Sequence, residues 1–324
     1  MEDNWESFKD DPWDGISINS YPTGRRLYLN DERYWISRNS LNQLVFYIQD
    51  VCPTFVPVAK NISSVDLSVE QYSDGEQRLV CTFLEPLDID NQKFGLAVKS
   101  ITVESEEFHG VELFLKVQEE LQDWASFLKN NNKKLTRSEL IGFWGELYVI
   151  SHEIMQDHDP KDAIRYWAGP KGKKDITLSS IAIEVKTTIS SQSKEIKISS
   201  LDQLDSTTEK LYLMHLFINT ADKENGISLD HLYELIRSSV QHDFAILALF
   251  IRKAGSMFEK AGLKQKEEPF ICSELNMYEV REGFPRLLRN NVPMGVMEAK
   301  YSLSIASVQA FCVTKNIRDI IKNG

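Results

Sequence analysis

The sequence predicts a mixed α/β protein, with a β-rich N-terminal part and an α+β C-terminal extension on either side of an α/β core. In residues 21–120, short apolar or alternating runs are separated by Asn, Asp, Gly and Pro, which is typical of β-strands and turns. In residues 136–218, segments with helical or strand-like periodicity follow in the order helix, three strands, helix, strand. A second mixture of helical and strand-like runs follows the core.

The N-terminal part is expected to be mostly β-structure that ends in a helix. Its strand-like runs are "RRLYLN", "LVFYI", "LVCTFL", "FGLAV" and "VELFLKV". Residues 112–129 have helical spacing, and the polar run "KNNNKK" at 129–134 suits a boundary. We therefore expect an acidic β-rich domain over residues 1–128.

The core is expected to begin with a helix at Thr136. Thr136 and Glu139 have the T-x-x-E spacing of a capping box, and apolar residues at helical spacing follow them. Three short strands are predicted next, then a short helix that begins in "ISSLDQL" and a further strand. The predicted strands are 175–178, 181–188, 195–199 and 211–218. A core domain is assigned to residues 129–220.

The remaining residues, 221–324, are expected to form the α+β extension. Apolar residues at helical spacing and alternating runs predict two helices and two strands there. The helices are 229–240 and 243–254, and the strands are 270–280 and 300–305.

The composition is that of a folded protein without a membrane-spanning segment. The 324 residues are 42% apolar, which is enough for a packed core. The longest apolar run, residues 245–251, is far too short to cross a bilayer, and the N-terminus does not resemble a secretory signal. The 4 cysteines lack CxxC spacing, so neither a zinc ribbon nor a disulfide scaffold is indicated. A reduced, cytoplasmic protein is expected.

The net charge of −11 is unevenly distributed along the chain. Residues 1–128 contain 10 Lys and Arg against 23 Asp and Glu, whereas residues 129–200 contain 12 against 9. The local field decides whether a polyanion is attracted, so the core is the part best suited to nucleic acid. An ordinary fluctuation of composition remains the alternative.

Two acids and a lysine in the core suggest metal chemistry. In a strand, Glu184 and Lys186 point to the same face, and a hairpin with 175–178 places Asp175 where twist or a bulge can bring it towards Glu184. Two neighbouring carboxylates repel each other unless a cation lies between them, and Mg²⁺ often takes one or two carboxylates plus water and phosphate oxygens. The lysine could orient the attacking water and offset charge on the phosphate. The pattern therefore predicts metal-assisted hydrolysis of a phosphodiester.

Two alternatives stay open for these residues. Glu-x-Lys also occurs at 195–197 and 298–300, without an acid on a preceding partner strand, so Glu184 and Lys186 could be a solvated ion pair. A further acid, Glu146, lies in an otherwise apolar helical segment beside Gly142 and Gly145, which would permit close approach of another backbone. By periodicity alone, Glu146 lies on an exposed stripe with Glu139.

The chain resembles the PD-(D/E)XK nuclease superfamily, and more narrowly the bacterial PD-(D/E)XK motif proteins. The likeness rests on "GFWGELYVI", "YWAGPKGKKDI", "IEVKTT", "IKISSLDQL", "YEVREGFPRL" and "VPMGV…KYSLSI", over about residues 136–306. The resemblance implies a restriction-endonuclease-like core with Asp175 and Glu184 as catalytic metal ligands, Lys186 as the motif lysine and Glu146 as an additional acid at the metal. Lys174, where the motif name has proline, precedes Asp175, and that position varies across the superfamily.

The resemblance also implies a substrate and partners. It implies Mg²⁺ or Mn²⁺ as cofactor, and DNA cleavage in bacterial restriction or phage defence beside ATPase subunits. The post-motif residues Ser199, Ser200 and Gln203 would approach the phosphate backbone. Lys171, Lys173 and Lys174 could also contact phosphate, or lie in a solvated loop. RNA as substrate, a homo-oligomer, and a non-cleaving nucleic-acid-binding or scaffold subunit are kept as alternatives.

Overall fold

The structure is a computed structural model that divides into two compact units, residues 1–132 and 133–324. The described residues are 11–322, except 53, 58–60, 63, 74, 85–90, 129–132, 171, 191–194, 206–207 and 315–316. Within them, no helix combines the length and the apolar character needed to cross a membrane.

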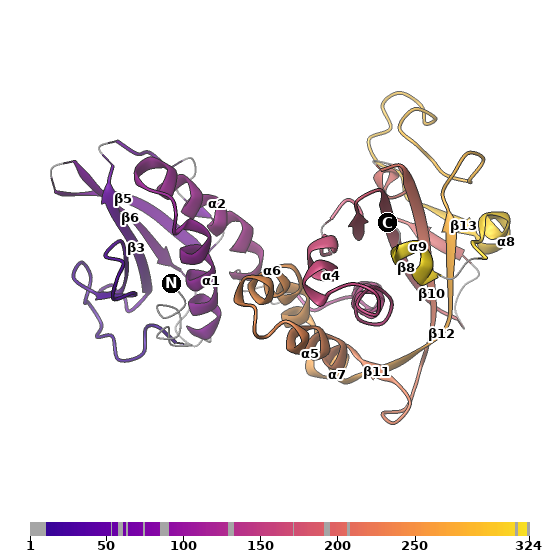
Figure 1. The fold of residues 1–324 in the computed structure, drawn as a ribbon, viewed down its shortest axis with the longest axis horizontal. Helices are drawn as coiled ribbons and strands as arrows, with labels where there is room; N and C mark the ends of the chain where they lie inside the picture. The colour runs from indigo at the N-terminus through magenta and orange to yellow at the C-terminus, as the bar shows by residue number, and fades with distance from the viewer. Residues whose placement is uncertain are drawn as a thin grey trace. The chain divides into compact units, whose positions relative to one another are not determined.

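The first unit contains an antiparallel sheet with the strand order β1-β2-β3-β6-β5-β4 (Figure 1). Its strands are β1 (Arg25–Arg26), β2 (Tyr34–Arg38), β3 (Leu44–Val51), β4 (Asn61–Ile62), β5 (Val65–Ser73) and β6 (Glu76–Phe83). The predicted runs "LVFYI" and "LVCTFL" lie in β3 and β6. Both strands are buried over most of their length, and consecutive apolar residues place apolar side chains on both faces of the sheet.

Two helices complete the first unit, α1 (Asn91–Ser105) and α2 (Gly110–Leu128). The helix predicted over 112–129 is confirmed by α2, but "FGLAV" and "VELFLKV" are helical and not strands. In α1 the buried residues Phe94, Ala97, Val98 and Ile101 recur every three or four positions. That is the spacing of one helix face, which a short apolar run does not distinguish from a strand.

The second unit is built on a mixed sheet with the order β11-β12-β10-β8-β7. Strands β8 and β10 are parallel, and the remaining neighbours are antiparallel. The strands are β7 (Ile176–Leu178), β8 (Ile181–Ile189), β10 (Lys210–Thr220), β11 (Ile227–Ser228) and β12 (Pro269–Glu279). The predicted extension therefore supplies β11 and β12 to the sheet that contains β8.

The third predicted core strand, β9 (Glu195–Ile198), pairs outside that sheet. It forms an antiparallel pair with β13 (Tyr301–Ser304), the strand predicted over 300–305. Ile196 and Ile198 of β9 pack with Leu211 and Leu213 of β10 in one buried cluster. The β9–β13 pair is thus held against one face of the mixed sheet by apolar burial.

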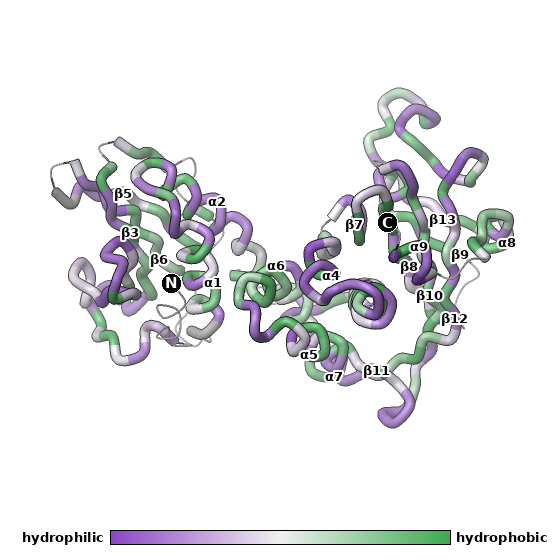
Figure 2. Tube along the Cα trace, viewed as in Figure 1, coloured by the Kyte–Doolittle hydropathy of each residue, from purple (hydrophilic) through white to green (hydrophobic). Residues whose placement is uncertain are grey.

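The predicted helices of the second unit are present as α3 (Arg137–Val149), η3 (Leu201–Leu204), α5 (Leu229–Ser239) and α6 (Phe244–Lys260), and further short helices occur where none was predicted. Thr136 and Glu139 form both hydrogen bonds of the capping box at the start of α3. Figure 2 shows α6 as mostly hydrophobic. The others include η2 (Ile150–Ile154), α4 (Pro160–Tyr166), α7 (Leu263–Glu267), α8 (Ile305–Val308), η4 (Gln309–Phe311) and α9 (Ile317–Lys322). The predicted order of helix, three strands, helix and strand is present from α3 to β10, with η2 and the unpredicted helix α4 inserted before β7.

Helix α3 lies unusually close to β8. A Cβ atom placed on Gly145 would lie 1.8 Å from Thr187 Oγ1, whereas one on Gly142 would meet no atom within 4 Å. Only glycine permits this approach at position 145, because any other residue would overlap the strand. The contact fixes the distance between the helix and the strand that carry the predicted acids.

Candidate active site

The hairpin of β7 and β8 places Asp175 beside Glu184. Ile176 pairs with Ile183 in this antiparallel hairpin, so the same register continued by one residue sets Asp175 opposite Glu184. The Asp175 carboxylate accepts a hydrogen bond from the Val185 backbone N–H at 2.7 Å. Neither a bulge nor unusual twist is needed to bring Asp175 to this position.

Glu184 and Lys186 form a buried ion pair on one face of β8. The Lys186 Nζ lies 2.7 Å from Glu184 Oε1, and the two side chains are 17% and 2% exposed. The alternative of a freely solvated pair is therefore wrong for this arrangement. Because both charges are largely withdrawn from water, each depends on the other for compensation.

Glu146 lies on α3, within electrostatic reach of Asp175 and Glu184. Its Oε2 accepts a hydrogen bond of 2.9 Å from Trp167 Nε1, and Trp167 is fully buried. Glu139 is exposed at the capping box, whereas Glu146 is partly buried. The alternative of a shared exposed stripe is wrong, because Glu146 is partly buried and bonded to Trp167, whereas Glu139 is exposed.

Burial raises the pKa of all three carboxyl groups. The pKa of Glu146 lies well above its usual value because of burial, and the neighbouring charges of Asp175 and Glu184 raise it further. Burial raises the pKa of Glu184 to about 7, although Lys186 opposes the rise, and the pKa of Asp175 is also raised by burial against the same lysine. The three acids thus repel one another, and Lys186 is a cation that stabilises each of them.

The donor set suits a hard divalent cation. Among the residues that the structure describes, no three Asp, Glu, His or Cys side chains are already gathered tightly enough to hold a metal ion. The chemistry nevertheless fits, since Mg²⁺ binds through one or two carboxylates with water and phosphate oxygens as further ligands. Asp175 and Glu184 would supply those carboxylates, with Glu146 as the additional acid.

The predicted lysines are placed differently from one another. Lys173 is exposed, and Lys171 lies outside the described residues. Lys174 is only 4% exposed, and its amine donates to the backbone carbonyls of Asp202 and Gln203 at 2.5 and 2.7 Å. These hydrogen bonds connect the segment before β7 to η3. Because the Lys174 amine is bonded within the fold, it is not placed to contact a phosphate.

The post-motif residues form a small polar turn next to η3. The Ser199 backbone N–H donates to Gln203 Oε1 at 2.7 Å, and Ser200 is the residue before η3. The Ser199 side chain is exposed, while Ser200 and Gln203 are partly buried. The structure thus brings these three residues together and gives Gln203 a role in shaping the turn.

Trp167 is a site residue that the sequence analysis did not identify. Its aromatic ring is fully buried in the core, and its indole N–H also donates to the Glu146 carboxylate. No spacing rule relates residues 21 positions apart in different elements. A buried tryptophan needs a partner for its N–H, and that requirement is the one general signal for such a role.

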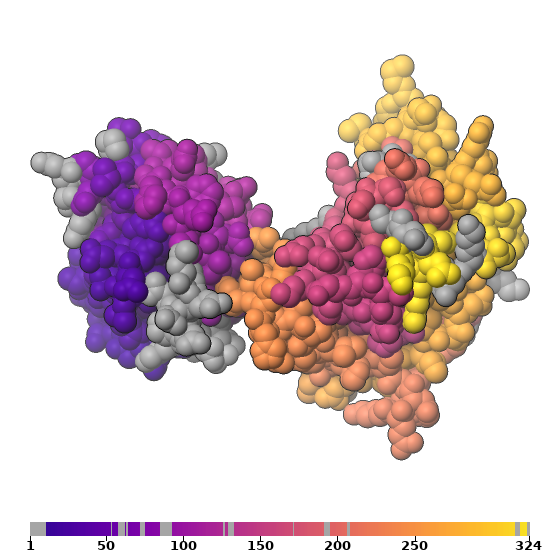
Figure 3. All heavy atoms as spheres, viewed as in Figure 1, coloured from indigo at the N-terminus to yellow at the C-terminus, as the bar shows by residue number. Residues whose placement is uncertain are grey.

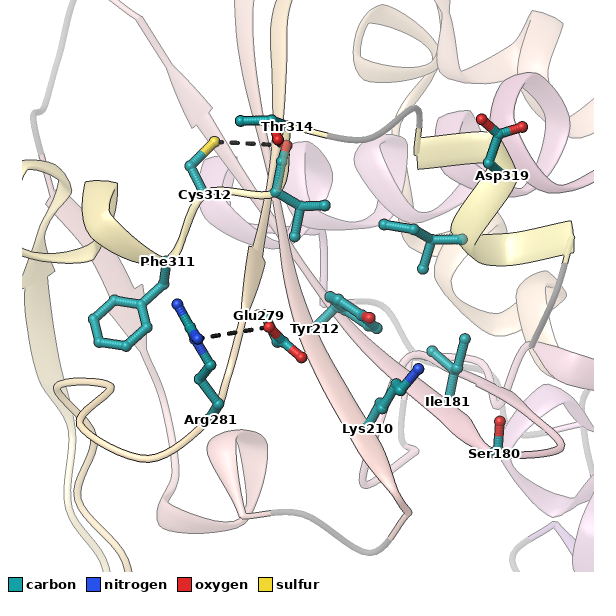
Figure 4. A pocket seen from close by; sticks show the side chains of 12 residues that line it. Ser180, Ile181, Lys210, Tyr212, Glu279, Arg281, Phe311, Cys312, Thr314 and Asp319 are labelled. Carbon is teal, nitrogen blue, oxygen red and sulfur yellow. Dashed lines mark hydrogen bonds and ion pairs between the residues drawn. The ribbon is translucent and has the colours of Figure 1, made fainter.

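A separate cavity of about 490 Å³ lies where β8 and β10 begin, at Ile181 and Lys210 (Figure 4). Lys210, Tyr212, Glu279 and Arg281 are among its lining residues. Its lining includes none of the four predicted catalytic residues. The positive charges of Lys210 and Arg281 are balanced there by Glu279 and Asp319, so the cavity does not favour a polyanion.

Comparison with known proteins agrees with the pattern at β7 and β8. An aspartate followed by Glu-x-Lys on neighbouring strands of a mixed α/β unit is the arrangement that defines the PD-(D/E)XK class. The chain belongs to the family described as "Putative PD-(D/E)XK family member, (DUF4420)", whose model matches residues 10–306. Searches of curated proteins and of solved structures returned no match. Family membership indicates a nuclease-like function.

Proposed function

We propose that this protein is a divalent-metal-dependent nuclease that hydrolyses phosphodiester bonds, acting as a DNA endonuclease in bacterial restriction or phage defence. The observation that carries the proposal is the juxtaposition of Asp175, which lies just before β7 and bonds the Val185 N–H, with Glu184 and its ion-pair partner Lys186 on β8. Family membership supports the same chemistry.

Each residue has a distinct role in the proposed reaction. Asp175, Glu184 and Glu146 would hold Mg²⁺ or Mn²⁺, which when bound polarises the phosphate and lowers the pKa of a water ligand. Lys186 would donate from its amine to a phosphate oxygen, or orient the attacking water, once a cation rather than the amine compensates Glu184. Trp167 orients Glu146 through the hydrogen bond to its carboxylate.

The proposal extends to the substrate and the setting. The exposed Lys173 and the Ser199–Ser200 turn adjoin the motif strands and would contact the sugar–phosphate backbone. Defence-system ATPase subunits or a second copy of the chain would be partners, and the acidic first unit would serve partner binding or target choice. This setting is the cytoplasm.

The test is cleavage by the purified full chain with Mg²⁺ or Mn²⁺, on supercoiled DNA, linear DNA and RNA. Asp175→Asn and Lys186→Ala should each reduce the cleavage rate by roughly a hundredfold or more, because each removes charge stabilisation at the reacting phosphate. The RNA arm decides between the two nucleic acids.

The matched control is the second Glu-x-Lys triplet, on β9. Glu195 and Lys197 are both exposed there, so Glu195→Gln and Lys197→Ala should cleave like the unmodified chain. Cleavage that survives Asp175→Asn and Lys186→Ala would refute the site assignment.

The second candidate is a nucleic-acid-binding subunit that does not cleave. The Lys186–Glu184 ion pair favours it, because a lysine that permanently compensates the acid would occupy the place of a cation. Calorimetric titration of Mg²⁺ or Mn²⁺ separates the two: the nuclease should show metal affinity that depends on Asp175, and the binding subunit should not.

A further inference from the structure

The loop between β12 and β13 exposes an unusual apolar tip. Met294, Val296 and Met297 are 104%, 37% and 77% exposed, so three large apolar side chains project within four residues. Figure 3 shows this part of the second unit projecting as a ridge at the upper right. Single exposed apolar residues are ordinary, but a cluster on a projecting turn indicates a contact surface.

The tip is a formed turn. The Val296 backbone N–H donates to the Pro293 carbonyl at 3.1 Å, and Gly295 has a φ of +96°. Proline and then glycine with positive φ two residues later fit a tight turn that presents the intervening Met294 outward. The apolar side chains are therefore displayed by a local hydrogen-bonded structure.

The base of the loop is anchored to the candidate active site. Arg286 donates to the Leu204 carbonyl at 2.6 Å, and Arg289 pairs with the Asp202 carboxylate at 3.2 Å, so both arginines bind η3. The same η3 receives the amine of Lys174, the residue before Asp175. The loop is thus connected through η3 to the segment that contains Asp175, directly before β7.

A second connection runs through β13. Tyr301 follows the loop, and its hydroxyl accepts a hydrogen bond from the Leu287 N–H at 3.2 Å. Burial raises the pKa of Tyr301, and the charges of Arg286 and Lys186 oppose the rise. Tyr301 therefore lies within electrostatic reach of the catalytic lysine. The end of the loop therefore lies near the proposed reaction centre.

The chemistry of the loop matches a nucleic-acid duplex. Its residues 285–300 contain Arg286, Arg289 and Lys300 against the single acid Glu298, in a chain whose net charge is −11. Arg289 pairs with Asp202 through Nε and Nη2 only and is 58% exposed, so it keeps N–H groups for a phosphate oxygen, and Lys300 is also exposed. Exposed cations near a tip of methionine, valine and proline are the combination by which proteins hold the backbone and insert a side chain between base pairs.

On the basis of the proposed function, we propose that the 285–300 loop is a wedge that inserts Met294 and Met297 between stacked bases of duplex DNA. Insertion would unstack one base step and bend the duplex, so that the scissile phosphate reaches the acids. A nuclease with this device would favour duplexes that are easily kinked.

The experiment compares intact DNA with DNA that carries a short bulge, where the stacking is already broken. Full-length protein is titrated with Ca²⁺ in place of Mg²⁺, and binding is followed by fluorescence anisotropy. The variant Met294→Ser/Met297→Ser should bind the intact duplex about tenfold more weakly, because it no longer recovers the cost of unstacking. It should bind the bulged duplex like the unmodified chain.

The control is Leu263→Ser, since Leu263 is 72% exposed on another surface of the same unit. It should bind both duplexes normally. Unchanged binding of intact DNA by the double variant, equal loss on both duplexes, or no binding of DNA by the unmodified chain would each overturn the wedge. The assay needs no cleavage, so bulge-dependent rescue in a protein that never cleaves would refute the nuclease while supporting the wedge.

Discussion

At the scale of single residues, the burial of Glu184 makes its ionised form less stable than it would be in water. Glu184 is buried in β8, and its pKa is raised to about 7 from an ordinary value of 4.5. A carboxyl group whose pKa is higher in the folded than in the unfolded state contributes stability at low pH, and that contribution disappears as pH rises through the folded value. The same direction holds for Asp175 and Glu146.

We therefore expect the metal-free protein to lose stability between about pH 4.5 and pH 7. The loss from Glu184 alone is on the order of 3 kcal/mol, and Glu184→Gln should flatten the profile. Urea unfolding in a chelator at several pH values measures it. Exposed Glu195→Gln serves as control, and an unchanged slope in Glu184→Gln would contradict the assigned burial.

The sequence predicts which residues meet in the site better than it predicts how they are held. Strand alternation suffices to place Glu184 and Lys186 on one face, and a short turn suffices to bring Asp175 alongside. The orientation of Glu146 depends on Trp167, which is far away in sequence. Likewise, a lysine in this loop is a residue type that often contacts phosphate. Only the structure shows that the Lys174 amine is bonded to the carbonyls of η3.

At the scale of elements, the contact between α3 and β8 fixes the site. Gly145→Ala should destabilise the protein by about 1–3 kcal/mol, because its Cβ would overlap Thr187. Gly142→Ala on the same helix meets open space and should be neutral or stabilise by up to ~1 kcal/mol. Thermal or urea unfolding of the two variants measures the contrast.

A second substitution tests the cause. Thr187→Ala removes the hydroxyl that the new methyl group would strike, so it should restore part of the stability of Gly145→Ala. Equal stability of the Gly142→Ala and Gly145→Ala variants would show that the helix does not approach the strand as described.

Local patterns identify α3, β8, β10 and β12, because each has a capping box or a long run of consistent periodicity. They fail for α1, where "FGLAV" is too short to separate the two periods. They also fail to pair β9 with β13, which lie about 100 residues apart, because the register of distant strands depends on the packing of both faces.

At the scale of the whole molecule, the second unit contains every described residue of the candidate site and both sheets on which the site depends. We expect residues 133–324 expressed alone to unfold cooperatively and to keep the metal-dependent cleavage of the full chain. Calorimetry and the cleavage assay measure both properties. A fragment that folds but does not cleave would assign part of the activity to residues 1–132.

The position of β8 within the sheet decides how the site can respond to a ligand. Strand β10 pairs with β8 along its whole length, from Ile181 to Ile189, and β7 pairs with its first three residues, so the backbone of the motif strand is held in place. Any tightening of the carboxylates around an incoming ion must then come from side-chain rotation and from the α3 flank. Amide exchange on binding should therefore slow in α3 and stay constant in β8.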